Sequence, residues 1–174
     1  DDVDALKAAG QLNLDGNQAA ADYFSGKLKI GQPIAEAGTN SKPARKLTAA
    51  EEKVFKLGRE IYFRDAHCAT CHQADGKGIP NIYPPLAKSN WIDDDERLTK
   101  ILLKGIWGPI KVNGKDFDPT KGVPPMMGFG GLLNDDEAAA VLSYVRLSFG
   151  NNGKLVSPAT VKKVREATKD QVNF

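Results

Sequence analysis

The sequence predicts an all-α fold, in which a few helices are joined by long loops and one small hairpin interrupts the helical pattern. Three segments, at about 49–64, 94–104 and 134–148, repeat apolar residues at helical spacing behind polar residues that cap helix N-termini. Between them, residues 75–85 and 122–131 are rich in glycine and proline, which argues against regular helices and central strands. The fold class follows from this alternation of helical and irregular segments.

The first predicted helix begins with a capping box and has one apolar face. Thr48 and Glu51 have the spacing at which each side chain can bond the backbone N–H of the other. The apolar positions behind them fall on one face of a helix: Val54, Leu57, Ile61 and Tyr62. Gly58 lies on the same face, where glycine costs about 1 kcal/mol relative to alanine unless close packing requires the missing side chain.

An acidic run, a second helix and the hairpin come next along the chain. The run Asp93-Asp94-Asp95-Glu96 could form a cation site, but it precedes an apolar helical pattern, and negative charge stabilises a helix N-terminus. The helix-start interpretation is therefore favoured, and Gly105 ends this helix. Residues 110–115, with Asn113-Gly114 at their centre, then predict a hairpin with a type I′ turn.

The last core helix and a short tail complete the chain. Asn134 can cap the core helix, and Gly150 follows its end. Ser157-Pro158 predicts the start of a short, basic, amphipathic helix. We therefore divide the chain into an N-terminal extension or linker, a central domain and a helical tail, at residues 1–46, 47–150 and 151–174.

The composition is that of an ordinary soluble protein and excludes several classes of function. The chain has 174 residues, of which 41% are hydrophobic and 26% charged, and its 24 basic and 22 acidic residues give a net charge of +2. So balanced a charge predicts no nucleic-acid partner. No apolar stretch approaches the roughly 20 residues needed to cross a bilayer, so no membrane span is expected. The sequence starts at Asp1, which is expected if a targeting segment was removed or the chain was trimmed.

All cysteines and histidines of the chain lie in one stretch, His67-Cys68-Ala69-Thr70-Cys71-His72. Cys-x-x-Cys-His is the attachment motif of a c-type haem. Two thiols a helical turn apart can add to the two vinyl groups on one edge of the porphyrin, and His72 then points its imidazole at the iron. The motif therefore predicts one haem c, covalently attached through Cys68 and Cys71.

Three other uses of these side chains are less favoured. The residues are too close together in the sequence to wrap a tetrahedral zinc ion. A thioredoxin-like redox pair needs a strand before the motif, whereas a helix is predicted there. A disulfide between Cys68 and Cys71 would close a very small loop and stabilise almost nothing.

With these elements in order, residues 47–150 closely resemble a class I cytochrome c. The resemblance includes the first helix with Gly58, the haem motif, the proline-bearing segment after it, the methionine-bearing loop and the last helix with Tyr144. It implies that helices and long loops wrap one covalent haem, and that the first and last helices cross where Gly58 meets Tyr144. It also implies that the Pro84 carbonyl accepts a hydrogen bond from His72 and so fixes the ligating imidazole.

The resemblance further implies a methionine as the second axial ligand of the iron, and the loop offers both Met126 and Met127. Adjacent side chains of an extended loop point in opposite directions, so only one can face the haem. The family's loop commonly runs Met-Pro-x-Phe, and the separation of Met126 from Phe129 reproduces that spacing. We therefore expect Met126 to bind the iron. Met127 is kept as the alternative, one residue further along, because this sequence departs from the family's loop: its prolines precede the methionines, and Met127 stands where the family often has proline.

Three further aromatic or imidazole side chains have two interpretations each. Trp107 and Trp91 could flank the haem or donate a hydrogen bond to a propionate, or they could simply pack in the core. Trp107, beside the Gly-Pro sequence before the hairpin, is the better propionate candidate. His67 could be considered as a second iron ligand, but its position beside Cys68 at the attachment edge favours a surface or packing role.

The resemblance implies one-electron transfer by a low-spin haem with His72 and Met126 as iron ligands, in an electron-transfer protein rather than an enzyme. The expected partner is a periplasmic redox enzyme, met by transient docking. Segments 72–78, 108–114 and 157–168 more narrowly resemble cytochrome modules associated with periplasmic oxidoreductases. Quinoprotein dehydrogenases and haem-linked copper nitrite reductases are examples of such partners.

Two alternative functions are kept open, and a location is expected. The chain could be an electron-entry domain cut from a larger fused oxidoreductase, with the same haem chemistry. It could also be a haem enzyme or gas sensor with an open sixth position on the iron. Because haem is attached to reduced thiols after export, the mature chain is expected to be periplasmic or otherwise exported.

Overall fold

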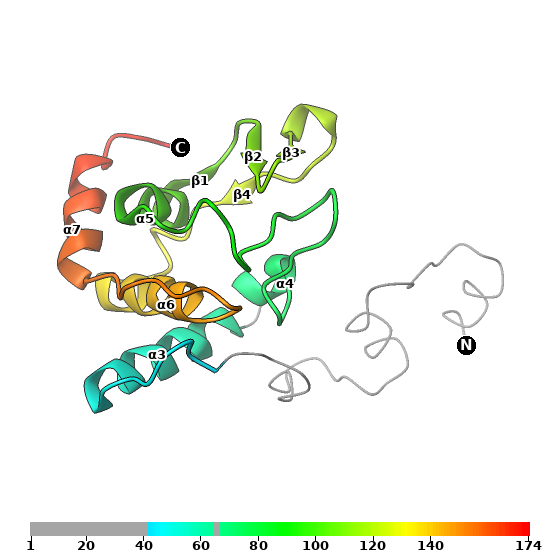
Figure 1. Cartoon of the computed structure of the whole chain (residues 1–174). Helices are drawn as coiled ribbons and strands as arrows, with labels where there is room; N and C mark the ends of the chain where they lie inside the picture. Colours follow the sequence, from blue (N-terminus) through cyan, green and yellow to red (C-terminus); the bar gives the residue numbers. More distant parts are fainter. Residues whose placement is uncertain (1–41, 65–66) are drawn as a thin grey trace, which may run out of the picture. The chain divides into compact units, whose positions relative to one another are not determined.

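The computed structural model of the chain describes residues 42–64 and 67–174, so most of the expected N-terminal extension lies outside the described part. Helices dominate the described residues, and the strands among them form only two-stranded antiparallel sheets, which confirms the predicted fold class. Figure 1 shows the helices, whose bounds are Ala49–Tyr62 (α3), Cys68–His72 (α4), Asp95–Lys104 (α5), Asp135–Leu147 (α6) and Pro158–Ala167 (α7).

The helix starts are fixed by side-chain caps, as the sequence predicts. Thr48 accepts a hydrogen bond from the backbone N–H of Glu51, and Glu51 accepts one from the backbone N–H of Thr48. Asn134 and Glu137 form the same reciprocal box at α6. In the acidic run, Asp94 caps α5, so the interpretation of these acids as a helix start is confirmed.

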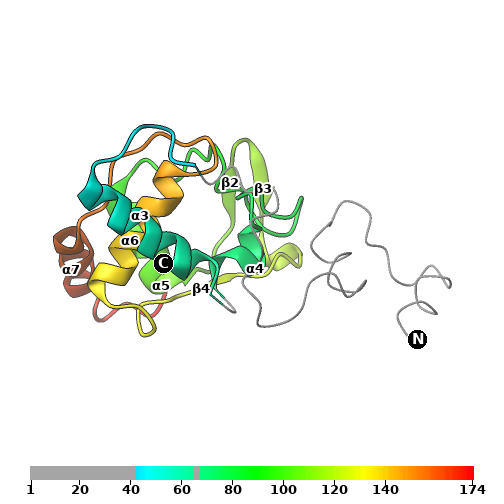
Figure 2. The same ribbon diagram turned by 90° about the horizontal axis from the view of Figure 1, so that it is seen from below.

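α3 and α6 cross with their backbones in close contact, as Figure 2 shows. A Cβ atom on Gly58 would lie 2.0 Å from the Ala140 carbonyl oxygen and 2.7 Å from the Cβ of Tyr144. Only glycine therefore fits at this crossing, and the implied contact between Gly58 and Tyr144 is found. Tyr62 and Phe149 complete an aromatic cluster around Tyr144, with ring centroids 5.3 and 5.6 Å from it.

α6 is the central element of the core. Its residues from Ala138 to Leu147 are all buried, whereas the sequence pattern predicts one buried face. The difference arises because α3, α5 and α7 all pack against α6. The alanines and the serine of α6 have small side chains, so neighbouring helices can approach it closely and cover it on several sides.

The four strands of the described residues follow α5 in the chain and form two short sheets. β2 (Ile110–Val112) and β3 (Lys115–Phe117) form the predicted hairpin. Asn113 and Gly114 connect them with φ values of 49° and 81°, as a type I′ turn requires. The second sheet was not predicted: β1 (Gly105–Ile106) pairs with β4 (Met126–Met127) inside a segment expected to be irregular. Strands of two residues have no period that a sequence pattern could reveal.

α7 packs against α5 and α6, and its residues Val161 and Val164 are buried.

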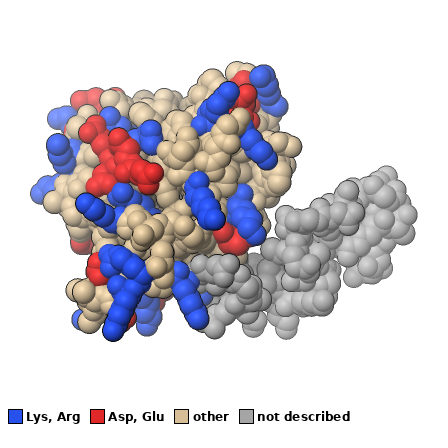
Figure 3. Space-filling model, viewed as in Figure 1, with Lys and Arg blue, Asp and Glu red and all other residues tan. Residues whose placement is uncertain are grey.

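None of the helices among the described residues is long and apolar enough to cross a membrane. On the face of the molecule drawn in Figure 3, side chains of both charges are present, and a group of acidic side chains lies over α5. Asp94 and Glu96, which stand at the start of that helix, are exposed.

Candidate functional site

A cavity of about 570 Å³ lies between α4, the β2–β3 hairpin, β4 and the facing sides of α5 and α6. No aspartate, glutamate, lysine or arginine is among the described residues that line it. Its volume is within the roughly 300–1,000 Å³ of pockets that bury small molecules and cofactors. The floor is formed by aliphatic side chains of α5 and α6: Leu98, Ile101, Leu102, Val141, Leu142 and Val145.

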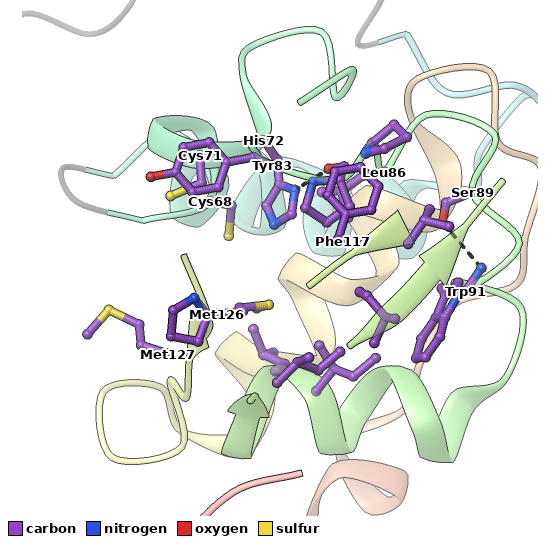
Figure 4. A pocket seen from close by; sticks show the side chains of 18 of the residues that line it. Cys68, Cys71, His72, Tyr83, Leu86, Ser89, Trp91, Phe117, Met126 and Met127 are labelled. Atoms are coloured by element: carbon purple, nitrogen blue, oxygen red, sulfur yellow. Dashed lines mark hydrogen bonds between the residues drawn. The ribbon is translucent and has the colours of Figure 1, made fainter. Parts of the chain in front are cut away.

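The Cys-x-x-Cys-His motif forms one wall of this cavity. The motif is the whole of α4, so Cys68 and Cys71 lie one helical turn apart, and both line the cavity together with His72. Figure 4 shows the three side chains on the same side of the space. The described residues include no group of three or more His, Cys, Asp or Glu side chains that could hold a metal ion.

His72 is held by the carbonyl group that the family resemblance implied. Its Nδ1 lies 2.9 Å from the backbone oxygen of Pro84, and because a carbonyl can only accept, the imidazole donates this hydrogen bond. Burial lowers the pKa of His72, and the hydrogen bond to Pro84 only partly opposes that shift. The imidazole is therefore neutral near neutral pH, with the lone pair of Nε2 available to a metal.

Cys68 lacks the electrostatic environment of a redox-active cysteine. Burial raises the pKa of Cys68 to about 12. A thioredoxin-like cysteine needs the opposite shift, because its thiolate must form near neutral pH. The element before the motif is the helix α3, not a strand. Both observations count against the thioredoxin-like alternative.

The methionines stand at the opposite wall, on β4. Met126 is half-buried and its side chain points into the space that His72 faces, whereas Met127 is 60% exposed and points away (Figure 4). The alternation follows from the pairing of β4 with β1, which aligns Met126 with Ile106 and Met127 with Gly105. A Cβ on Gly105 would lie 2.1 Å from the Met126 carbonyl oxygen, so glycine permits this close pairing.

The other candidate residues lie at the edges of the cavity. Trp107 lines its mouth and is 55% exposed. Trp91 also lines the cavity, but its indole N–H donates to the Lys111 carbonyl at 2.7 Å, which leaves Trp107 as the better propionate candidate. His67 packs against Phe129 with ring centroids 5.4 Å apart, in agreement with a packing role.

Part of the cavity wall was not identified from the sequence. Leu98, Ile101 and Leu102 were expected to form a helix face, and the structure shows that this face borders the cavity. Phe117 is buried at the end of β3 and lines the cavity, but no motif in the sequence marks it. An amphipathic pattern shows that a face is covered, without showing whether protein or a cofactor covers it.

The donors and the cavity fit a covalently attached haem. Two thiols and a neutral imidazole stand on one wall, a thioether faces them, and the space between is apolar. Thiols at this spacing can form the two thioether links, and nitrogen and thioether sulfur are the axial donors found in cytochromes c.

Comparisons with known proteins agree with this site. The family model for cytochrome c matches residues 55–148. Cytochrome c-552 of Thermus thermophilus is 35% identical over 116 residues, which are 63% of this chain and 82% of that protein.

Cytochrome subunits of dehydrogenases match over a smaller share of their own length. The cytochrome c subunit of the quinone alcohol dehydrogenase of Gluconobacter oxydans is 33% identical over 114 residues, 62% of this chain and 22% of the subunit. The cytochrome subunit of fructose dehydrogenase from Gluconobacter japonicus is 30% identical over 118 residues, 64% of this chain and 22% of the subunit. With the helical fold and the Cys68–Cys71 attachment motif, these matches establish that the chain belongs to the cytochrome c family of electron-transfer proteins and carries one haem c.

Proposed function

We propose that this protein transfers single electrons through a low-spin haem whose iron is bound by His72 and Met126. The observation that carries the proposal is the placement of these two side chains on opposite walls of one apolar cavity (Figure 4). His72 is held by the Pro84 carbonyl, and Met126 is oriented by the β1–β4 pairing. Ligands held by the fold in this way need not move when the iron changes its oxidation state.

Four other residues have proposed roles toward the haem. Cys68 and Cys71 would form the two thioether links, which fix the ring beside α4. The Pro84 carbonyl would set the plane and the tautomer of the ligating imidazole. Trp107 would donate its indole N–H to a propionate at the cavity mouth, where the side chain is partly exposed.

The haem, when bound, supplies an iron that takes up and releases one electron. The residues of the chain determine how readily this occurs. The aliphatic side chains of α5 and α6 exclude water and carry no charge, so they disfavour the more positively charged ferric form. A thioether ligand from Met126 acts in the same direction, and both effects raise the reduction potential.

An open sixth position on the iron is the main alternative, and carbon monoxide distinguishes the two. We expect the ferrous, haem-loaded chain to bind carbon monoxide slowly, because Met126 must first leave the iron. We also expect one reversible one-electron transition in a redox titration. Fast binding of one equivalent of carbon monoxide, unchanged in the Met126→Ala variant, would instead support a gas sensor or a haem enzyme.

The proposed partner is a redox enzyme that docks transiently at the cavity mouth. Trp107, Pro124, Pro125 and Met127 are exposed there, and none of them carries a charge. The relatives named as cytochrome subunits of dehydrogenases support an oxidoreductase as the partner. This chain spans 22% of the alcohol dehydrogenase subunit, which keeps open the alternative of an electron-entry domain in a longer oxidoreductase.

The domain division is proposed on the same basis. Residues 47–150 would form the cytochrome domain, residues 151–174 a tail that contributes α7, and residues 1–46 an extension or linker. Purification from the native source would show whether the chain is a free carrier or an electron-entry domain of a longer oxidoreductase. A free carrier would elute at the mass of one chain, whereas an electron-entry domain would remain on the polypeptide that oxidises the substrate.

The location is proposed to be the periplasm or an equivalent exported compartment. Covalent attachment needs reduced Cys68 and Cys71 and the maturation machinery that acts after export. We expect expression without an export signal or that machinery to give colourless, largely unfolded protein, as measured by haem absorption and far-ultraviolet circular dichroism. Full haem incorporation in an unassisted cytosol would contradict this proposal.

A further inference from the structure

α7 lies beyond the residues that match the cytochrome c family model, yet it contacts the loop that follows the methionines. Arg165 makes this contact with all three nitrogens of its guanidinium group. Nε donates to the Asp135 carboxylate at 2.8 Å, one terminal nitrogen donates to the Leu133 carbonyl at 2.8 Å, and the other donates to the Gly130 carbonyl. One side chain therefore ties α7 to the loop and to the first turn of α6.

The loop that Arg165 holds connects β4 to α6 and contains three glycines, Gly128, Gly130 and Gly131. Glycine has more backbone freedom than other residues, so this connection needs tertiary contacts to stay in one conformation. Its inner side has such contacts with the end of α5. The N–H of Phe129 donates to the Leu102 carbonyl at 2.7 Å, and the N–H of Gly130 donates to the Leu103 carbonyl at 3.1 Å.

Arg165 contacts the side of this loop that faces away from α5. The peptide units of Gly130 are thus held at the N–H by α5 and at the carbonyl by α7. α7 can serve as a fixed support because Val161 and Val164 are 0% and 3% exposed against the core. Asp135 adds an ion pair with Arg165, and both side chains are 31% exposed.

We propose that Arg165 is a positioning residue for Met126. Separation of β4 from β1, together with movement of the following loop away from α5, would carry the Met126 thioether out of the cavity. Arg165 opposes this movement by holding two carbonyls of that loop. The tail helix thereby controls how often the sixth position of the iron opens. This inference rests on the proposed ligation by His72 and Met126.

Imidazole binding to the ferric, haem-loaded chain measures this opening, because imidazole can bind only after Met126 has left. We expect Arg165→Ala to accelerate imidazole binding about tenfold, as lost charge-assisted hydrogen bonds favour the open loop. Arg165→Lys keeps the charge beside Asp135 but cannot bond both carbonyls, so an intermediate rate is expected. If the alanine variant does not fold, the rate of imidazole binding to the lysine variant still tests whether Arg165 slows the opening.

Arg146→Ala is the matched control. Arg146 also joins two elements, pairing with Asp95 and donating to the Asp93 carbonyl at 3.1 Å, but it holds the start of α5 rather than the methionine loop. We expect this variant to lose global stability without faster imidazole binding. An unchanged rate in both Arg165 variants, or an equal acceleration in Arg146→Ala, would overturn the inference.

A double variant separates this inference from the proposed function. In a Met126→Ala background imidazole should bind at once, and Arg165→Ala should add no further acceleration. If Met126→Ala itself binds imidazole at the rate of the unmodified chain, the proposed iron ligation is wrong. If Met126→Ala behaves as expected and Arg165→Ala has no effect alone, only the positioning role is wrong.

Discussion

Replacing His72 by alanine is expected to remove an iron ligand and to destabilise the fold at the same time. His72 is 8% exposed, and its ring connects α4 to the Pro84 segment across a 2.9 Å hydrogen bond. Truncating a buried side chain of this size costs about 2–5 kcal/mol, before the lost bond to iron is counted. Since small domains are stable by only about 5–15 kcal/mol, the variant should melt at a much lower temperature or without cooperativity.

The reason for so large an effect lies in the position of the cavity. α4, α5, α6 and the β2–β3 hairpin all contribute to its lining, so the elements of the core meet at the haem rather than only at one another. His67→Ala is the control, because it removes the other histidine of the motif segment without changing a proposed ligand. We expect that variant to keep its low-spin spectrum and most of its stability. A cooperative, native-like melt of His72→Ala with haem attached would show that the iron does not organise this domain.

The features that could be predicted from the sequence are those encoded within a few residues. The capping boxes at Thr48 and Asn134 need only residues three positions apart. The Asn113-Gly114 turn and the spacing of Cys68, Cys71 and His72 within one helical turn are equally local. Such signals fix helix starts, a hairpin and the attachment edge, because the atoms that interact are already neighbours in the chain.

The features that could not be predicted depend on pairs far apart in the sequence. β1 and β4 are two residues long and separated by the whole hairpin, so no periodicity marks them. The contacts of Arg165 with the Gly130 and Leu133 carbonyls involve backbone atoms, which every residue possesses. Residue types alone therefore could not distinguish Arg165 from other tail residues, and the orientation of the methionines stayed open until the strand register was known.

Met126→Ala is expected to open the iron, and Met127→Ala is expected to leave it closed. In the ferric protein, loss of Met126 should abolish the methionine-to-iron charge-transfer absorption and admit exogenous ligands. The reduction potential should fall by at least about 59 mV, which is a tenfold change in a one-electron equilibrium. The reason is that a thioether ligand raises the potential and only Met126 points toward the cavity.

Met127→Ala is a control matched in chemistry, position and strand. Met127 is 60% exposed, and its Cα pairs with Gly105 on the same two-stranded sheet, so its removal costs little packing. Absorption, potential and ligand binding should all stay close to those of the unmodified chain. The reverse pattern would move the ligand by one residue and require the β1–β4 register to slip, since a shift of one residue exchanges the two faces of a strand. If neither variant had any effect, the His/Met carrier would be refuted, because the chain contains no third methionine.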